Sequence, residues 1–432
     1  MPKLSVPFLL GAASAATQIE GGDRGNSWYD WYRAGHIKDG SSPEVADRHY
    51  ELWREDLALM KDMGLQTCRF GVEWSRIEPE EGVFCEEALA HYREEIQALA
   101  DAGIRPLLTL HHFTNPRWFE SMGAFENPRC ADYLLRFSEK VVRTVGDLVS
   151  EYITINEPNV YAMLGYFSGE WPPGKRRFSS YRRVLTNMSA CHIALYEMIH
   201  RVRREMGFTD TRVSFAHHLC HFVPAHPASP WDRLCRHFAS LGFQDAVSRA
   251  MYLGEVTFPI GHHPGIRRGQ WCDFIAVNYY RRITVAGLTA DAPQGAAVND
   301  LGWEIDPQGL AQVCRQLYGL LPRPIYITEN GTCDSSDTYR SRLIYEHLKA
   351  LCESGLPVER YYHWCFCDNF EWLEGQSARF GLVHVDYATQ QRTVKDSGRF
   401  YAAVIRDGGV SEEVYQRYCQ ADYPRRGKEK AP

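Results

Sequence analysis

The sequence lacks three features that would have pointed to other classes of protein. No uninterrupted run of eighteen apolar residues is present, so we expect no membrane-spanning helix. None of the thirteen cysteines forms a CxxC pair, and their number is odd, which argues against a zinc site or a disulfide framework. The net charge of −6 mixes both signs, so we expect no nucleic-acid partner. Reduced, buried thiols are typical of a cytoplasmic protein.

The two termini carry weak signals. Lys3 precedes the apolar stretch 6–16, which superficially resembles a secretion signal. A single lysine is a poor charged region, and Gly11 interrupts the stretch as it would between a strand and a loop. We therefore expect a cytoplasmic location. The basic run at 425–430 belongs to a segment, about 421–432, that we expect to be a frayed tail.

Strand and helix patterns alternate along the whole chain. Apolar runs bounded by Gly or Pro indicate strands at 7–13, 65–71, 104–110, 152–155, 211–216, 274–279, 324–329 and 360–366. Apolar residues at helical spacing indicate helices at 51–63, 86–102, 129–148, 182–206, 231–250, 307–320, 339–353 and 394–405. Eight such repeats predict an α/β fold, a single (β/α)₈ TIM barrel with extended βα loops. It would occupy residues 1–432 as one catalytic domain.

Two of the predicted strands end in a glutamate. Glu157 is followed by Pro158, and Glu329 lies two residues before Gly331. Active sites of parallel barrels lie at the carboxyl ends of the strands. Two carboxyl groups there suit glycoside hydrolysis, in which one is protonated and the other ionised. A retaining mechanism predicts a separation of about 5–5.5 Å, and an inverting one about 6.5–9.5 Å.

An ordered set of motifs places these glutamates in a known context. The motifs are the runs 8–21, 69–70, 74–76, 110–113, 154–158, 278–280, 328–331, 364–372 and 379–381. In this order the chain resembles glycoside hydrolase family 1, the retaining β-glucosidase and β-galactosidase family, from Phe8 to about Tyr387. The resemblance implies a (β/α)₈ barrel and an exo-acting β-glycosidase that needs neither cofactor nor metal.

The resemblance also implies a role for individual residues. Glu157 would be the acid/base and Glu329 the nucleophile. Residues that support these two would be Arg69, Asn156, Asn278 and Tyr280. Residues that bind the sugar would be Gln18, His112, Asn156, Trp364, Glu371, Trp372 and Phe380. A guanidinium beside a carboxylate lowers the pKa of that carboxyl, so Arg69 would keep Glu329 ionised.

One segment of the sequence, residues 369–372, restricts the class of substrate that we expect. Glu371 and Trp372 follow Asn369-Phe370, where the phospho-glycosidase branch of the family carries hydroxyl residues and a lysine. A carboxylate at this position would accept hydrogen bonds from neutral hydroxyls and repel a sugar phosphate. Phe113 stands where a tryptophan is common, which removes an indole N–H. We expect a small, unphosphorylated β-glycoside as substrate. The glucose, galactose or fucose preference and the aglycone stay open.

Several alternatives remain at this point. The histidines at 217, 218, 221, 262 and 263 could suggest a metal, but packing in a loop or cleft wall is favoured. A transglycosylase would use the same residues as a hydrolase. A carbohydrate-binding protein with vestigial catalysis is a third reading, which the intact glutamates oppose. The sequence does not give the oligomeric state.

Overall fold

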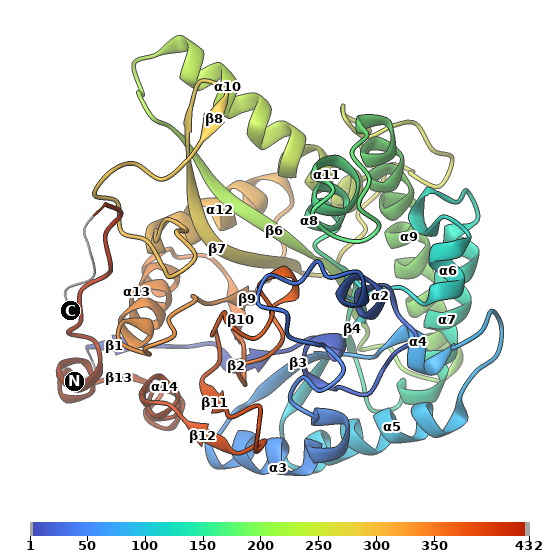
Figure 1. The fold of residues 1–432 in the computed structure, drawn as a ribbon, viewed down its shortest axis with the longest axis horizontal. Coiled ribbons are helices and arrows are strands. Elements are labelled where there is room, and N and C mark those ends of the chain that lie inside the picture. The colour runs from blue at the N-terminus through green and yellow to red at the C-terminus, as the bar shows by residue number, and fades with distance from the viewer. Residues whose placement is uncertain (1–2, 428–432) are drawn as a thin grey trace.

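The centre of the computed structural model, which describes residues 3–427, is a closed barrel of eight parallel strands (Figure 1). The barrel strands are β2 (Leu9–Ala13), β3 (Thr67–Gly71), β4 (Arg105–His111), β5 (Glu151–Asn156), β6 (Arg212–Pro224), β7 (Ile275–Ala286), β9 (Ile325–Asn330) and β10 (Val358–Trp364). They follow one another in chain order around the barrel, and β10 pairs with β2 to close it. The predicted fold class is confirmed.

The strands are buried on both faces. Every residue of β3, β5 and β9 is buried. Parallel strands in such a position must be covered by the barrel interior on one side and by helices on the other. Their sequences therefore read as β-branched and apolar runs rather than as alternating patterns, which is why the sequence revealed them.

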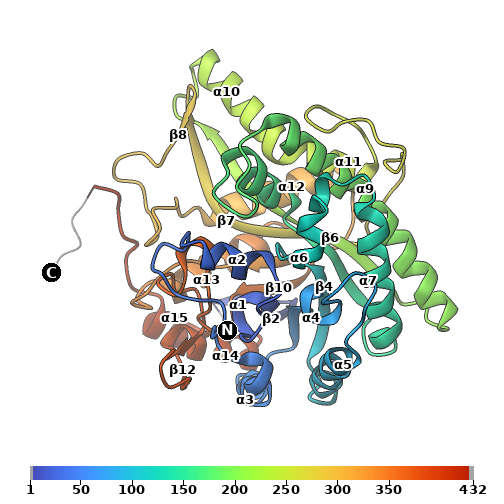
Figure 2. The ribbon, with the colours of Figure 1, turned by 45° about the vertical axis from the view of Figure 1, so that its right-hand side comes forward.

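An outer ring of helices covers the barrel (Figures 1 and 2). It consists of α3 (His49–Asp62), α5 (Glu86–Asp101), α7 (Cys130–Val145), α9 (Phe178–Glu205), α10 (Pro230–Ser240), α11 (Ala246–Leu253), α12 (Pro307–Leu320), α13 (Arg340–Glu353) and α14 (Asp396–Asp407). In α7, Leu134, Phe137, Val141 and Val145 are buried at spacings of three and four residues. This spacing places them on one face of the helix, turned to the core.

Shorter elements occupy the connections between strands and outer helices, or lie near the chain ends. The helical ones are α1 (Ala16–Ile19), α2 (Ser27–Arg33), α4 (Trp74–Ile77), α6 (Arg117–Ser121), η1 (Ala124–Glu126), α8 (Pro158–Ala162), η2 (Met163–Ser168), η3 (Leu241–Asp245), η4 (Trp372–Glu374) and α15 (Glu412–Tyr418). The strands are the antiparallel pairs β1 (Leu4–Ser5) with β13 (Gly409–Val410) and β11 (Val383–Val385) with β12 (Arg392–Val394), and β8 (Thr289–Ala290) beside β7.

The structure differs from the sequence prediction at the fifth and sixth barrel strands. We expected them to end at 216 and 279, but β6 and β7 continue as a pair beyond the barrel to Pro224 and Ala286. Phe222 and Val285 on this extension are buried against residues of α10 and η3, which stabilises it. The helix expected at 231–250 is α10, the π-helical turn η3 and α11.

The last described residues contact the body of the protein. The Tyr423 hydroxyl donates a hydrogen bond to Glu346, and Arg425 donates one to the Gly295 carbonyl. Of the segment 421–432 that we expected to be frayed, residues 428–432 lie outside the described residues. Among residues 3–427, the helices are all too short or too polar to cross a membrane.

Candidate active site

The two predicted catalytic glutamates line the same cavity. Glu157 comes directly after β5, and Glu329 is the next-to-last residue of β9. Both are buried, with 5% and 3% of their surfaces exposed, and both line a cavity of about 250 Å³. Glu157 adopts a left-handed backbone conformation with φ of 42°, and Pro158 then begins α8. Such a conformation is uncommon for a residue other than glycine and is typical of functional sites.

Arg69 on β3 connects the two strand ends. Its guanidinium contacts Glu329 Oε1 and donates a hydrogen bond of 2.7 Å to Asn156 Oδ1. Arg69 is completely buried, so its charge is stable only because these acceptors surround it. The guanidinium therefore fixes one side of Glu329 and the amide of Asn156 at the same time.

Asn278 on β7 extends this network to Glu157. Its Nδ2 donates to Glu157 Oε1 at 2.7 Å and to Asn156 Oδ1 at 3.0 Å. Its own Oδ1 accepts a hydrogen bond of 2.6 Å from the Thr328 hydroxyl, which fixes the amide orientation. One buried network of hydrogen bonds and ion pairs thus runs from Glu329 through Arg69, Asn156 and Asn278 to Glu157.

The charge of Glu329 is set by opposing effects. Burial raises the pKa of Glu329 to about 7, against the lowering effect of Arg69, and the nearby Glu157 raises it further. The Tyr280 hydroxyl donates a hydrogen bond of 2.6 Å to Glu329 Oε2 and favours the ionised form. Burial and the Glu329 charge also raise the pKa of Tyr280, so this hydroxyl stays a neutral donor. Two carboxyl groups in one cavity disfavour a double negative charge.

Aromatic residues make up another part of the cavity wall. The His112 ring stacks on Trp364 at 5.9 Å and on Trp372 at 5.8 Å between ring centroids. Burial and the charge of Arg69 lower the pKa of His112, so the ring is neutral at physiological pH. Within residues 3–427, His112 Nδ1 and Gln18 Oε1 are buried without a hydrogen-bond partner. Unpaired buried polar atoms beside a cavity suit the hydroxyl groups of a ligand.

The protonation state of Glu371 differs from the ionised state that we expected from the sequence. It accepts hydrogen bonds from Gln18 Nε2 at 3.2 Å and from Trp364 Nε1 at 3.4 Å. Burial raises the pKa of Glu371 to about 8, and the charge of Glu329 adds to this effect. Near neutral pH the carboxyl group is therefore largely protonated and can both donate to and accept from a sugar hydroxyl. Charge repulsion of a sugar phosphate by Glu371 is weaker than the sequence argument assumed.

The predicted residues divide into two groups by position. Those that line the cavity are Glu157, Glu329, His112, Tyr280, Trp364, Glu371, Trp372 and Phe380. Those that lie behind this wall with no exposed surface are Gln18, Arg69, Asn156 and Asn278. The structure therefore brings all twelve together, eight in the wall and four in the supporting layer.

Other lining residues were not among the predicted set. They are Phe113, Val160, Met163, Leu164, Trp171, His218, Phe243, Arg281 and Trp303. Most come from α8, η2 and η3 or from β6 and β7 beyond the predicted strand ends, where sequence patterns do not predict a strand register. His218 had one usable signal, because His217 and His218 are adjacent and neighbouring side chains on a strand point to opposite faces.

The histidines of β6 do not gather around one point. His217 Nε2 contacts the Gln244 carbonyl at 3.1 Å, His218 contacts Glu157, and His221 contacts Asp306. No group of three or more His, Cys, Asp or Glu side chains between residues 3 and 427 is arranged to hold a metal ion. His218 belongs to the cavity wall and makes a polar contact with Glu157 there.

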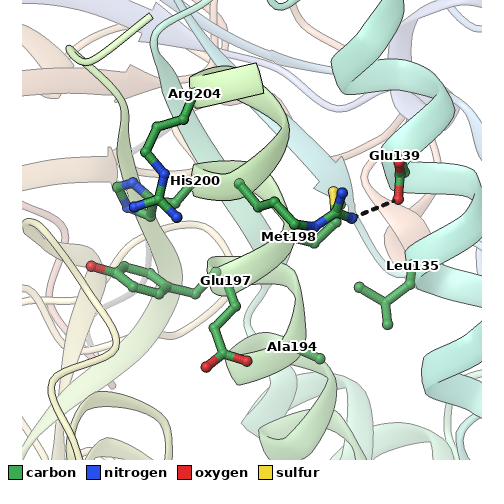
Figure 3. Close-up of a pocket in the computed structure, with 9 residues that line it drawn as sticks. Leu135, Glu139, Ala194, Glu197, Met198, His200 and Arg204 are labelled. Carbon is green, nitrogen blue, oxygen red and sulfur yellow. Dashed lines mark hydrogen bonds and ion pairs between the residues drawn. The ribbon is translucent and has the colours of Figure 1, made fainter. Parts of the chain in front are cut away.

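A wider groove of about 730 Å³ lies on the outside of the barrel between α7 and α9 (Figure 3). Leu135 and Glu139 come from α7, and the other lining residues come from α9. Arg201 and Glu139 form an ion pair of 3.0 Å across it. Surface ion pairs of this kind are common. None of the predicted site residues lines this groove.

A family model, curated sequences and solved structures each match this chain over most of its length. The family model described as glycosyl hydrolase family 1 matches residues 2–410. Beta-glucosidase A of Acetivibrio thermocellus is 31% identical over 95% of this chain and all of its own length. Beta-glucosidase A of Thermotoga maritima is 29% identical over 94% of this chain and 98% of its own. A beta-glycosidase from Pyrococcus horikoshii has a TM-score of 0.88 and 33% identity, with 98% of this chain and 99% of that chain covered.

Proposed function

The chain belongs to glycosyl hydrolase family 1 and is a β-glycosidase, and we propose that it releases terminal β-linked sugars from small glycosides with retention of configuration. The observation that carries this proposal is the single buried network that joins Glu157 and Glu329 in one cavity. We assign the acid/base role to Glu157 and the nucleophile role to Glu329.

In the first step, a carboxylate oxygen of Glu329 attacks the anomeric carbon. Arg69 and Tyr280 contact the two oxygens of Glu329 and favour its ionised form. Glu157 gives its proton to the glycosidic oxygen as the bond from that oxygen to the anomeric carbon breaks. The aglycone leaves as an alcohol, and a glycosyl ester of Glu329 remains.

In the second step, water attacks the anomeric carbon from the side that the aglycone left. Glu157, now ionised, takes a proton from this water as the ester bond to Glu329 breaks. Each step inverts the anomeric carbon, so the released sugar has the configuration of the substrate. No step needs a cofactor or metal, because proton transfer and charge stabilisation come from side chains.

Unphosphorylated sugars are the proposed substrates. His112 and Glu371 line the cavity and provide neutral groups that donate to and accept from hydroxyls. Gln18 lies behind the wall and donates to Glu371 instead. Trp364 and Trp372 provide apolar faces against which the C–H face of a sugar ring packs. Among residues 3–427, the groups of the wall that can carry a positive charge are Arg281 on β7 and His218 on β6.

We also propose that the chain acts as one catalytic domain in the cytoplasm. The thirteen cysteines are all free thiols, and ten of them are buried, which suits a reducing compartment.

The test compares Glu329→Gln and Glu157→Gln in hydrolysis of phenyl β-glucoside. Each variant should lose about 10³-fold or more in kcat/KM, because a nucleophile or an acid/base is removed. The first sugar released by the unmodified enzyme should be the β-anomer by proton NMR. Release of the α-anomer contradicts retention, and substantial activity in Glu329→Gln contradicts the assignment of the nucleophile.

Glu139→Gln is the control variant. Glu139 lies in the outer groove between α7 and α9, away from the catalytic cavity. The same substitution there should leave kcat/KM unchanged, which shows that loss of a glutamate charge alone does not inactivate the protein.

A further inference from the structure

His218 on β6 contacts the proposed acid/base directly. Its Nδ1 lies 3.0 Å from Glu157 Oε1. The same oxygen already accepts a hydrogen bond of 2.7 Å from Asn278 Nδ2. When Nδ1 of His218 carries a hydrogen, Oε1 accepts from two donors and is a poor site for a proton, so Oε2 is the oxygen that can carry one.

The His218 ring is held in a fixed position. It stacks on Tyr280 with a centroid distance of 5.7 Å and packs edge-on against Phe243 at 5.8 Å. Its side chain is 13% exposed. The Asn159 side chain donates a hydrogen bond of 2.9 Å to the His218 carbonyl, which also fixes the backbone. The contact with Glu157 is therefore built into the cavity wall.

The titratable groups around His218 lie on or directly after three strands. Glu157 follows β5, Cys220 and His217 share β6 with His218, and Arg281 and Tyr280 lie on β7. Burial opposes a charge on His218, but Glu157 and then Cys220 raise its pKa to about 10. His218 and Arg281 in turn lower the pKa of the buried Cys220 thiol, although burial raises it. Glu157 is the group that His218 contacts at hydrogen-bond distance in the cavity.

We propose that His218 is a positioning residue that acts through Glu157. Its Nδ1–H occupies Oε1 together with Asn278 and leaves the transferable proton to Oε2, and its loss changes the pH dependence of the first step. The proposal rests on the proposed acid/base role of Glu157. No comparison assigns His218 a role, and the sequence favoured simple packing.

The two steps respond to His218 in opposite directions. Cleavage of a poor leaving group needs protonated Glu157, so a neighbouring cation confines this step to lower pH. Attack by water needs ionised Glu157, which the same cation favours. His218 keeps its own proton in both steps, because the proton that moves is on Oε2 of Glu157.

The experiment measures kcat/KM against pH for phenyl β-glucoside with the unmodified enzyme and with His218→Asn. Asparagine keeps an N–H donor at the δ position and removes the charge. We expect the basic limb of the profile to move to higher pH by about one unit, since an opposite charge this close lowers a carboxyl pKa by about 1–3 units. With 2,4-dinitrophenyl β-glucoside, the basic limb of the profile should lie at the same pH in the unmodified enzyme and in His218→Asn, because that leaving group needs no proton.

Two further variants make the result decisive. His221→Asn changes a histidine of the same strand that pairs with Asp306 instead of Glu157, and its basic limb should not move. His218→Ala should shift the limb as His218→Asn does and also lower kcat, because the positioning donor is lost. Each variant is also treated with 2,4-dinitrophenyl 2-fluoro-β-glucoside. Release of one equivalent of dinitrophenol per chain shows that the cavity of the variant is intact.

The proposal is overturned if His218→Asn releases a full equivalent of dinitrophenol and its basic limb stays within about 0.3 pH unit of the parent, below the expected shift. It is also overturned if neither variant at position 218 releases dinitrophenol, since packing alone would then explain the residue. The assignment of Glu157 fails separately: it is wrong if Glu157→Gln still hydrolyses phenyl β-glucoside, whatever the variants at position 218 do.

Discussion

At the scale of single residues, Arg69 is the group that most strongly favours the ionised form of the proposed nucleophile, Glu329. Its guanidinium is completely buried and contacts Glu329, the Thr328 carbonyl at 3.2 Å, Asn156 and the Thr109 hydroxyl at 3.1 Å. A buried cation with four acceptors cannot turn away to another partner without leaving them unpaired. Arg69 therefore acts as a fixed positive charge beneath the cavity.

Replacement of this charge should move the acid limb of the pH profile. Glu329 must be ionised to attack, and its pKa is raised to about 7 by burial despite Arg69. In Arg69→Met the lowering effect is lost, so the pKa of Glu329 rises further. The acid limb of kcat/KM for 2,4-dinitrophenyl β-glucoside should shift to higher pH by about one unit or more.

A surface arginine provides the matched control. Arg93 pairs with Asp147 at 2.7 Å and its side chain is 41% exposed. Arg93→Met should leave the acid limb in place. An unchanged limb in Arg69→Met, with activity retained, would show that Arg69 does not set the charge of Glu329.

At the scale of elements, α7 shows how an outer helix packs against a segment at the carboxyl ends of the barrel strands. Phe137 is fully buried and stacks on Trp74 of α4 with a centroid distance of 5.0 Å. The helix α4 follows β3, which carries Arg69. The apolar face of α7 therefore supports the segment that follows the strand of this arginine.

Phe137→Ala should lower the free energy of unfolding by about 3–5 kcal/mol, because it removes buried apolar surface and leaves a cavity. Urea unfolding followed by circular dichroism measures this change. Phe238→Ala makes the same substitution on α10, where the side chain is 60% exposed, and should change stability by less than about 0.5 kcal/mol. Equal losses in the two variants would contradict the packing described for α7.

The extension of β6 and β7 is one of the elements that sequence reasoning missed. Val285 pairs with Pro224 at its outer end, and Phe222 is covered by η3. Each strand alone reads as an ordinary loop after a short barrel strand, because its side chains are only partly apolar. Burial of the pair becomes possible only when η3 and α10 fold over it.

At the scale of the whole molecule, the two ends of the barrel have different tasks. The proposed catalytic network lies at the carboxyl ends of the strands, where active sites of parallel barrels are found. At the opposite end, Glu151 on β5 and Arg360 on β10 form a buried ion pair of 3.0 Å. The Tyr326 hydroxyl on β9 also donates to Glu151 at 2.9 Å. This second network joins three strands of the closed barrel.

Glu151→Gln should therefore weaken the fold without altering the chemistry. Loss of one partner leaves a buried charge on Arg360, which costs about 3–5 kcal/mol. The denaturation midpoint should fall, while kcat for phenyl β-glucoside at 25 °C stays within about twofold, since the site is at the other end. The double variant Glu151→Gln with Arg360→Met should recover part of the lost stability. A large change in kcat would contradict this separation of tasks.

The sequence by itself determined the barrel, its strand positions and the two glutamates. Buried parallel strands must be apolar throughout, and a glutamate at the end of such a strand stands out against that background. The ordered motifs then supplied the supporting residues, including Arg69, which lies 260 positions before Glu329.

Only the tertiary structure determined which of these groups lie close together and how far their pKa values are shifted. The proximity of His218 to Glu157 depends on the register of β5 and β6, which pair through Asn156 and Ala216. Burial depth, which no local pattern contains, raises the pKa values of Glu329 and Glu371. Local sequence specifies which strand a side chain belongs to, but electrostatics depend on distances between strands that meet only when the barrel closes.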